Sequence, residues 1–350
     1  MSDIVREKAN GRVNLIGEHT DYNGGWVLPT AIPQYTEVSV MKTGTNKVHI
    51  KSSGSREETY ELGKEKHTGT WIDYLQGATK LLSEKGKLGG MEVTINSTMP
   101  EGSGLSSSAA LEISFLKALR HTFDVKVTDI ELALLGQRIE NEFVGARVGI
   151  MDQMAVSLAK SGEAIFLDTK ELTFERVELP LDQMDLVVIN SGLSHQLSAH
   201  DGGYNQRRAQ CEEACKIIGI HQLRDISVTE LASKNLPDPL NRRARHVVTE
   251  NERVHQAVKA IKEKNLPVLG KLFLESHRSM RDDYEVSIPE IDLLVELCMT
   301  HSECFGARLT GGGFGGSIVA ITKKGEGKKV SAKVAETYEK KTKHKATVLV

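Results

Sequence analysis

The sequence has few cysteines, little net charge and no long apolar segment, and each of these absences excludes a class of protein. No apolar run approaches the ~20 residues that are needed to span a bilayer, and residues 1–8 contain no signal-peptide core. The four cysteines among 350 residues make no disulfide framework, and their spacing fits no metal site. We therefore expect four reduced thiols in a cytoplasmic protein.

The remaining composition is that of an ordinary soluble protein. Of the 350 residues, 39% are hydrophobic and 26% are charged, and the formal net charge is −2. A balance this close to neutral gives no electrostatic reason to expect nucleic acid or a membrane as the main partner. The chain is long for one core and has room for two lobes. It contains no internal repeat, low-complexity tract or obvious linker.

The most informative stretch runs from Pro100 to Glu112. Apolar alternation over residues 91–95 predicts a strand before it, and helical spacing over residues 111–119 predicts a helix after it. The loop between them is rich in glycine and serine, and a helix start suits an anion such as phosphate. An ordinary turn with serine caps is the alternative. No lysine follows the glycines and Ser107 replaces the last glycine of GxGxxG, so neither common nucleotide-binding pattern is present.

A second stretch, GRVNLIGEHTDYNGG over residues 11–25, concentrates hydrogen-bonding side chains. Arg12, Glu18, His19 and Asp21 all fall within ten residues. Carboxylates and an imidazole suit a polyhydroxylated ligand, because each hydroxyl can donate a hydrogen bond to a carboxylate. From composition alone, a solvated turn is the alternative.

Three further stretches carry candidate residues. A capping box at Thr128 predicts a helix through Ile139, and Glu140 follows directly. Asp152 lies among apolar residues, where an unpaired carboxylate would be costly, and a helix cap is the alternative interpretation. Five glycines between residues 311 and 316 demand unusual backbone dihedrals or a close backbone approach. A flexible hairpin is the alternative for this run.

Together these motifs resemble those of one family. The pattern P-x-x-x-G-L-S-S-S-A is similar to the phosphate loop of the GHMP kinases, and GRVNLIGEHTDYNGG is similar, nearly letter for letter, to the galactokinase signature. The glycine run at residues 311–316 resembles the third GHMP motif. Asn10 and Val148 stand where the family usually has Pro and Cys, and the segment before Tyr204 is longer than usual. The resemblance covers almost the whole chain.

The resemblance implies an α+β fold, the two-lobed GHMP kinase fold with mixed sheets and helices, and an active site in the cleft between the lobes. We expect residues 1–170 to form an N-terminal lobe that carries the sugar-binding and phosphate-loop motifs. Residues 171–350 are expected to form a C-terminal lobe that carries the third glycine-rich motif.

The implied activity is ATP-dependent phosphorylation of galactose at the anomeric hydroxyl, a step of galactose catabolism by the Leloir pathway. By resemblance, Asp152 would take the hydroxyl proton, Arg12 would hold Asp152 ionised, and Ser108 and Glu140 would ligate Mg²⁺. The resemblance assigns substrate binding to Glu18, His19, Thr20, Asp21, Gly149, Asp152 and Tyr204. It assigns nucleotide binding to Ser52, Gly102, Ser103, Gly104, Leu105, Ser106, Ser107 and Ser108.

Two other functions stay open at this point. One is a kinase of the same family for a neighbouring sugar: N-acetylgalactosamine, galacturonate or arabinose. The other is a non-catalytic sensor that binds sugar and ATP. The intact EHTD run over residues 18–21 favours galactose, and the retained SSAA run over residues 107–110 favours turnover. We expect galactose and MgATP as partners, with no nucleic acid, membrane or obligate protein partner.

Overall fold

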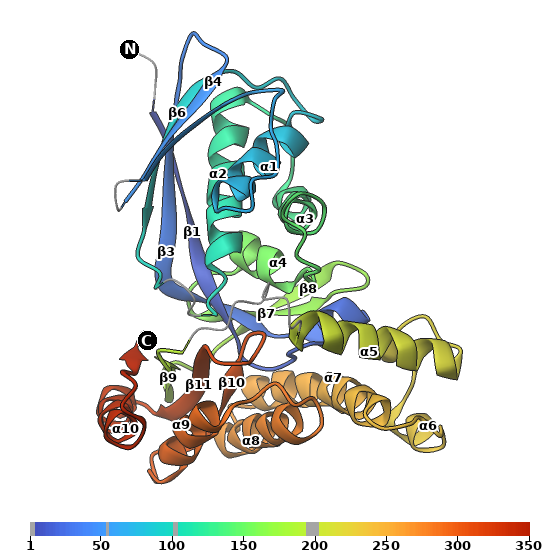
Figure 1. Cartoon of the computed structure of the whole chain (residues 1–350). Helices are drawn as coiled ribbons and strands as arrows, with labels where there is room; N and C mark the ends of the chain where they lie inside the picture. Colours follow the sequence, from blue (N-terminus) through green and yellow to red (C-terminus); the bar gives the residue numbers. More distant parts are fainter. Residues whose placement is uncertain (1–3, 54–55, 101–103, 194–202) are drawn as a thin grey trace. The chain divides into compact units, whose positions relative to one another are not determined.

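The computed structural model describes residues 4–53, 56–100, 104–193 and 203–350 (Figure 1). The chain divides into two compact units. Unit 1 comprises Met1–Arg12, Ala31–Glu101 and Ser106–Ala159, and unit 2 comprises Val13–Thr30, Gly102–Leu105 and Lys160–Val350. The chain passes between the units several times, and a lobe boundary near residue 170 stays a prediction. Within the described ranges, no helix is long and apolar enough to cross a membrane.

The chain contains both strands and helices, which confirms the expected mixture of α and β structure. Among the described residues, eight strands form the first sheet, in the order β2 (Trp26–Val27), β7 (Glu163–Asp168), β3 (Pro29–Lys42), β6 (Met91–Ser97), β4 (Lys47–Ser52) and β5 (Arg56–Glu61). In the same sheet, β1 (Ile4–Asn14) pairs with β3, and β8 (Thr173–Glu178) pairs with β7. Four strands form the second sheet, in the order β10 (Cys304–Thr310), β11 (Ser317–Lys323), β9 (Met184–Asn190) and β12 (Thr347–Val348).

The elements that lie wholly or mainly in unit 1 are these strands and helices: β1 (Ile4–Asn14), β3 (Pro29–Lys42), β4 (Lys47–Ser52), β5 (Arg56–Glu61), β6 (Met91–Ser97), α1 (Ile72–Leu82), α2 (Ser107–Phe123), α3 (Asp129–Arg138), the π-helix η2 (Ile139–Val144) and α4 (Met151–Leu158). The predicted strand over 91–95 is β6, and the predicted helix over 111–119 lies within α2. The predicted capping box is also confirmed, because Thr128 and Glu131 form both of its hydrogen bonds at the start of α3.

The core of unit 1 lies between the strands and helices α1, α2 and α3, which cover one face of them (Figure 1). Every second side chain is buried over residues 36–40 of β3 and 91–95 of β6, as alternation in a half-buried strand requires. Val38 lies opposite Ile95, and Val40 lies opposite Val93, in the antiparallel register of β3 and β6. β4 runs parallel to β6 on its other side. Strand β6 is therefore central, and it leads directly towards the loop before α2.

The elements that lie in unit 2 are these: η1 (Asp21–Asn23), β2 (Trp26–Val27), β7 (Glu163–Asp168), β8 (Thr173–Glu178), β9 (Met184–Asn190), α5 (Gly203–Ile218), η3 (Leu223–Asp225), α6 (Val228–Ala232), α7 (Leu240–Lys262), α8 (Leu266–Asp282), α9 (Pro289–Met299), β10 (Cys304–Thr310), β11 (Ser317–Lys323), α10 (Gly327–Thr342) and β12 (Thr347–Val348). Helix α7 packs on α8, and both α8 and α9 pack on β10.

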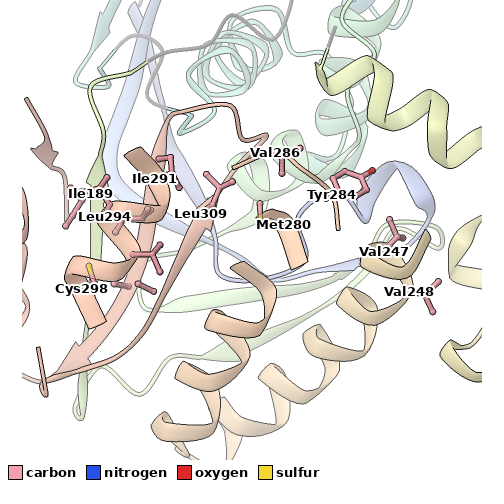
Figure 2. Packing of buried hydrophobic residues seen from close by; sticks show 14 of the residues in the cluster. Ile189, Val247, Val248, Met280, Tyr284, Val286, Ile291, Leu294, Cys298 and Leu309 are labelled. Carbon is pink, nitrogen blue, oxygen red and sulfur yellow. The ribbon is translucent and has the colours of Figure 1, made fainter. Parts of the chain in front are cut away.

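The core of unit 2 fills the space between these helices and the antiparallel sheet (Figure 2). Ile189 of β9 and Leu309 of β10 contribute from the sheet, and Leu294 of α9 and Met280 of α8 contribute from the helices. Tyr284 is buried with them at the end of α8, although it carries a hydroxyl group. A buried hydroxyl needs hydrogen-bond partners, and those partners belong to the candidate site.

Candidate active site

The ion pair between Arg12 and Asp152 is the first cluster of predicted residues that the structure brings together. Arg12 comes from β1, and Asp152 lies in the first turn of α4. Arg12 donates from Nε to Asp152 Oδ1 at 2.8 Å and from Nη2 to Oδ2 at 2.7 Å. Ser106 Oγ also donates to Oδ2, at 2.6 Å. These contacts fix both carboxylate oxygens, while the Asp152 side chain stays 32% exposed.

This geometry bears on the alternative in which Asp152 is only a helix cap. Helix α4 has Ile150 at its N-cap position, and no side-chain cap hydrogen bond is formed there. The oxygens of Asp152 instead accept hydrogen bonds from Arg12 and Ser106. An oriented and partly exposed carboxylate of this kind can accept a proton from a hydroxyl group that lies within hydrogen-bond reach.

The phosphate-loop residues lead into α2. Gly102 and Ser103 lie outside the described residues. Gly104 has a φ of 73°, a conformation that favours glycine, and Leu105 is buried beside it. Ser106 also has a positive φ, 61°, which is uncommon for a residue with a side chain. Such backbone strain is often found at functional sites.

Helix α2 begins at Ser107, which is exposed, and its N-cap residue Ser106 makes no side-chain hydrogen bond to the first turn. The first amides of a helix have no partner within the helix, and they carry its positive dipole end. The hydroxyl of Ser106, which could have capped the helix, is used for Asp152 instead. The start of α2 therefore presents amide donors of the kind that bind phosphate.

The third glycine run approaches the phosphate loop within unit 2. Gly311 has a φ of 88°, and a Cβ atom at this position would lie 3.2 Å from the carbonyl oxygen of Gly104. A side chain there would be strained by its backbone and would crowd the loop. The glycine-rich sequence is thus explained by close backbone contact rather than by a flexible hairpin.

Ser108 and Glu140 are the second predicted pair that lies together. Ser108 Oγ donates to Glu140 Oε1 at 2.8 Å. Glu140 is buried in the π-helix η2, and burial raises its pKa to about 7, although the hydrogen bond from Ser108 opposes the shift. A buried carboxylate that resists ionisation is suited to a cation, which would compensate its charge.

These two residues fit a magnesium ion only in company with substrate oxygens. Within the described part of the chain, no group of three or more His, Cys, Asp or Glu side chains could hold a metal. Mg²⁺ commonly takes one or two protein oxygens and completes its shell with phosphates and water. The donor set of one hydroxyl and one carboxylate agrees with that habit.

Glu112 is a buried carboxyl group in unit 1 that the sequence analysis did not single out. It lies on α2, and atoms of Glu112 and Gln153 both flank Gly136 of α3. Burial, together with the charges of Glu140 and Asp152, raises the pKa of Glu112 well above its usual range. A glutamate in an otherwise apolar helix face was the only sequence signal for it.

In unit 2, Glu18 is buried and already has partners. Its side chain is 1% exposed, and it forms an ion pair with Arg308 at 2.5 Å. The backbone N–H of Gly311 donates to Glu18 Oε1 at 3.1 Å. Burial raises the pKa of Glu18, while Arg308 acts in the opposite direction. Thr20 is also buried, and its hydroxyl lies 2.8 Å from the carbonyl oxygen of Gly17 and 2.7 Å from that of Trp26, either of which can accept its single hydrogen.

His19 lies in an aromatic cluster that includes Tyr204. The ring centroid of His19 is 5.4 Å from that of Tyr204 and 4.7 Å from that of Tyr284. Its Nδ1 lies 2.8 Å from the hydroxyl oxygen of Tyr22, which lies 2.9 Å from that of Tyr284. Burial lowers the pKa of His19 to about 3, so its imidazole is neutral at physiological pH. The sequence predicts a role at the sugar for Tyr204 but not for Tyr284, which is distant in sequence.

The remaining predicted residues are less closely tied to these clusters. Asp21 begins η1 and is partly exposed, and its backbone oxygen accepts a hydrogen bond from Thr169 at 3.0 Å. Gly149 is buried just before α4, three positions before Asp152. Ser52 is partly exposed at the end of β4, and its side chain shares no hydrogen bond with the other predicted residues that the structure describes.

Comparisons with known proteins show which families this chain is similar to. Family models match the GHMP kinases N terminal domain over residues 73–160, the galactokinase galactose-binding signature over 7–42 and the GHMP kinases C terminal domain over 257–340. A galactokinase of Thermotoga neapolitana is 39% identical, with 98% of this chain and 96% of that protein covered. A galactokinase of Haemophilus influenzae is 41% identical, with 98% and 91% covered.

Solved structures extend the likeness to the fold. A Lactococcus lactis galactokinase in complex with galactose superposes with a TM-score of 0.94 at 34% identity, covering 99% of this chain and 92% of that one. A mevalonate kinase of Methanococcus jannaschii, at 17% identity and a TM-score of 0.68, shares the fold. The expected GHMP kinase fold is therefore confirmed, and the chain belongs to the galactokinases of the GHMP kinase family.

Proposed function

We propose that the chain transfers the γ-phosphoryl group of ATP to the anomeric hydroxyl of galactose, giving α-galactose 1-phosphate and ADP. The carboxylate of Asp152 carries the proposal, because Arg12 and Ser106 hold both of its oxygens. A sugar hydroxyl is a poor nucleophile, and a positioned carboxylate that accepts its proton assists its attack on phosphorus. The signature match over residues 7–42 and the galactokinase relatives support galactose as the acceptor.

The sugar contacts are assigned to the EHTD motif of residues 18–21 and to the aromatic cluster around His19. Glu18 and Asp21 accept hydrogen bonds from the sugar hydroxyl groups, and His19 exchanges one with a sugar hydroxyl. The ring of Tyr204 packs near His19. Gly149 and the base Asp152 complete the assignment. Thr20 supports the motif through its bonds to backbone carbonyls. The neutral imidazole of His19 can donate to one hydroxyl without placing a positive charge beside the sugar.

The ATP phosphates are assigned to the start of α2 and the loop before it: Gly102, Ser103, Gly104, Leu105, Ser106, Ser107 and Ser108. Ser52 is assigned a contact with the nucleotide. Ser108 and Glu140 would hold Mg²⁺, which supplies charge compensation to the phosphates when it is bound. The reaction is placed in the cytoplasm, where ATP is available and the four free cysteines stay reduced.

A coupled assay of ADP release tests the proposal. The purified protein is given MgATP and one sugar at a time: galactose, N-acetylgalactosamine, galacturonate or arabinose. We expect ADP release with galactose above the other sugars, and a phosphate at C1 of the product by phosphorus NMR. A phosphate at C6 or a preference for another sugar would refute the assignment. Binding of galactose and ATP without ADP release would indicate a sensor instead.

A further inference from the structure

Four charged side chains of unit 2 form a buried charge cluster: Glu18, Glu250, Arg253 and Arg308. Arg308 is fully buried on β10, and it pairs with Glu18 at 2.5 Å and with Glu250 at 3.7 Å. Arg253 pairs with Glu250 at 2.6 Å. Ser276 joins the cluster, since its hydroxyl donates to Glu250 Oε1 at 2.5 Å and accepts from Arg308 Nε at 3.2 Å. The two positive and two negative charges cancel.

The charge cluster holds the backbone of residues 14–18, which lead into the EHTD motif. Arg308 Nη1 donates to the carbonyl oxygens of Asn14 and Leu15, at 3.3 Å and 3.0 Å. The N–H of Gly17 donates to Glu250 Oε1 at 3.0 Å. Thus two side chains, from β10 and α7, bind three backbone groups of this buried segment: the carbonyl oxygens of Asn14 and Leu15 and the N–H of Gly17.

Strand β10 adds two more contacts to the same segment. Thr310 Oγ1 donates to the carbonyl oxygen of Asn14 at 3.0 Å and accepts from the Asn14 N–H at 3.1 Å. The next residue, Gly311, donates its N–H to the carboxylate of Glu18. His246 of α7 lies 3.1 Å, through Nε2, from the carbonyl oxygen of Glu18. The segment is therefore fixed at both its backbone and its carboxylate.

Stability alone does not explain such a cluster. Taking charges out of water is costly. A protein in which well-packed apolar residues replace a buried ion pair is often equally stable or more stable. Burial favours the neutral form of Glu250, yet Arg253, His246 and Arg308 lower its pKa to about 2, so it stays ionised. What the charges provide here is a defined position for the segment that precedes His19 and Asp21.

We propose that Arg308 and Glu250 are positioning residues for galactose recognition. They fix residues 14–18 and orient the Glu18 carboxylate, so that the sugar-binding side chains are held in place before galactose arrives. The inference rests on the proposed function, because it takes galactose to be the ligand of this motif. It predicts that loss of the contacts that the Arg308 guanidinium makes with Asn14, Leu15 and Glu18 raises the KM for galactose. The KM for ATP should stay unchanged.

Arg308→Lys is the decisive variant, since it keeps the charge but cannot form the fork of several hydrogen bonds. We expect the KM for galactose, and its Kd by calorimetry, to rise about tenfold or more, as is typical when buried charged hydrogen bonds to a site are lost. The KM for ATP should change less than about twofold, which is within ordinary variation for an uninvolved site.

Arg243→Lys is the matched control. Arg243 is also buried in unit 2 and pairs with Glu285, Gln210 and the backbone of Asp283; among the described residues it forms no hydrogen bond or ion pair with residues 14–18. It should lose stability in the same way as Arg308→Lys without a tenfold rise in the galactose KM. If Arg308→Lys does not fold, the galactose KM of Ser276→Ala tests the positioning role instead. This variant removes only the hydroxyl that links Arg308 to Glu250, and its galactose KM should rise.

The outcomes separate the two proposals. A wild-type protein that does not phosphorylate galactose refutes the proposed function. An active wild type with an unchanged galactose KM in Arg308→Lys, or with equal rises for galactose and ATP, overturns the positioning role. Equal galactose effects in Arg308→Lys and Arg243→Lys overturn it as well, and so does an unchanged galactose KM in Ser276→Ala should that variant be needed.

Discussion

Replacement of Asp152 by Asn tests the proposed base with little change of shape. The carboxylate now accepts two hydrogen bonds from Arg12 and one from Ser106. In Asp152→Asn, one oxygen becomes an amide NH2, which cannot accept a proton and cannot accept hydrogen bonds from its present donors. The variant should lose about 10²–10⁴-fold in kcat, the usual contribution of a general base.

The structure also predicts the cost in stability. A hydrogen bond to a charged group contributes about 1.5–3 kcal/mol. The Asp152 side chain is 32% exposed, so solvent screening reduces this figure to about 1–2 kcal/mol. For a chain of 350 residues, such a loss lowers Tm by roughly 1–3 °C. Asp152→Asn should therefore fold and bind both substrates while it loses catalysis.

Kinetics, calorimetry and thermal unfolding together make the test. The kcat and KM values come from ADP release, the affinities for galactose and ATP from calorimetry, and Tm from thermal unfolding. Asp129→Asn is the matched control, since Asp129 pairs with Arg120 at 2.7 Å in the same unit, apart from the predicted site. It should lose comparable stability and keep its kcat.

Arg12→Ala extends the same test. Because Arg12 and Asp152 act on one proton transfer, the double variant should lose less activity than the product of the two single losses. A folded Asp152→Asn protein that binds galactose and ATP and keeps nearly full kcat would refute the reasoning, since neither a base nor an orienting carboxylate would then be required.

Three other predictions concern the sugar, the metal and pH. Asp21→Ala should raise the KM for galactose by about 5- to 100-fold, because a sugar hydroxyl would lose its hydrogen-bond acceptor. A similar rise in the KM for ATP would contradict the assignment. Ser108→Ala and Glu140→Gln should each raise the Mg²⁺ concentration that gives half-maximal rate, and unchanged titrations in both would make the pair structural. Burial lowers the pKa of His246 to about 4, below its ordinary value of 6.5, so the unfolded chain binds more protons between these pH values. The free energy of unfolding should consequently fall as pH falls from 6.5 to about 4, by up to about 1.4 kcal/mol per pH unit for this one group. In denaturant titrations at several pH values, His246→Gln should show a smaller dependence of the free energy of unfolding on pH.

Local sequence patterns were sufficient to predict those elements whose structure depends on residues that are close in the chain. The alternation before residue 96 predicted β6, and the capping box at Thr128 predicted the start of α3. The contact between Arg12 and Asp152 spans 140 positions, and no periodicity could reveal it. Both residues were nevertheless found, because each belongs to a motif whose family resemblance implies a shared role.

Residues that act through tertiary contacts alone were not found. Arg308 interrupts an apolar strand, and its sequence neighbourhood does not indicate that Asn14, Leu15 and Glu18 are its partners. Glu250 lies in a helix rich in charged residues, where an exposed position would be the ordinary expectation. Their burial follows from the packing of α7, α8 and β10 around residues 14–18, which requires the folded chain.

Burial also separates the roles of the two carboxylates that are assigned to the sugar. In the proposed reaction Asp152 gains and loses a proton in each turnover, and its side chain is 32% exposed, whereas Glu18 is 1% exposed and paired with Arg308. A carboxylate has about four lone-pair positions, and Gly311 and Arg308 occupy two of those on Glu18. The positions that remain can accept sugar hydroxyls without displacing either partner. Under the proposed function, Glu18 would be a fixed acceptor rather than a base. A change at Arg308 should then alter the binding of galactose without changing the proposed proton transfer to Asp152.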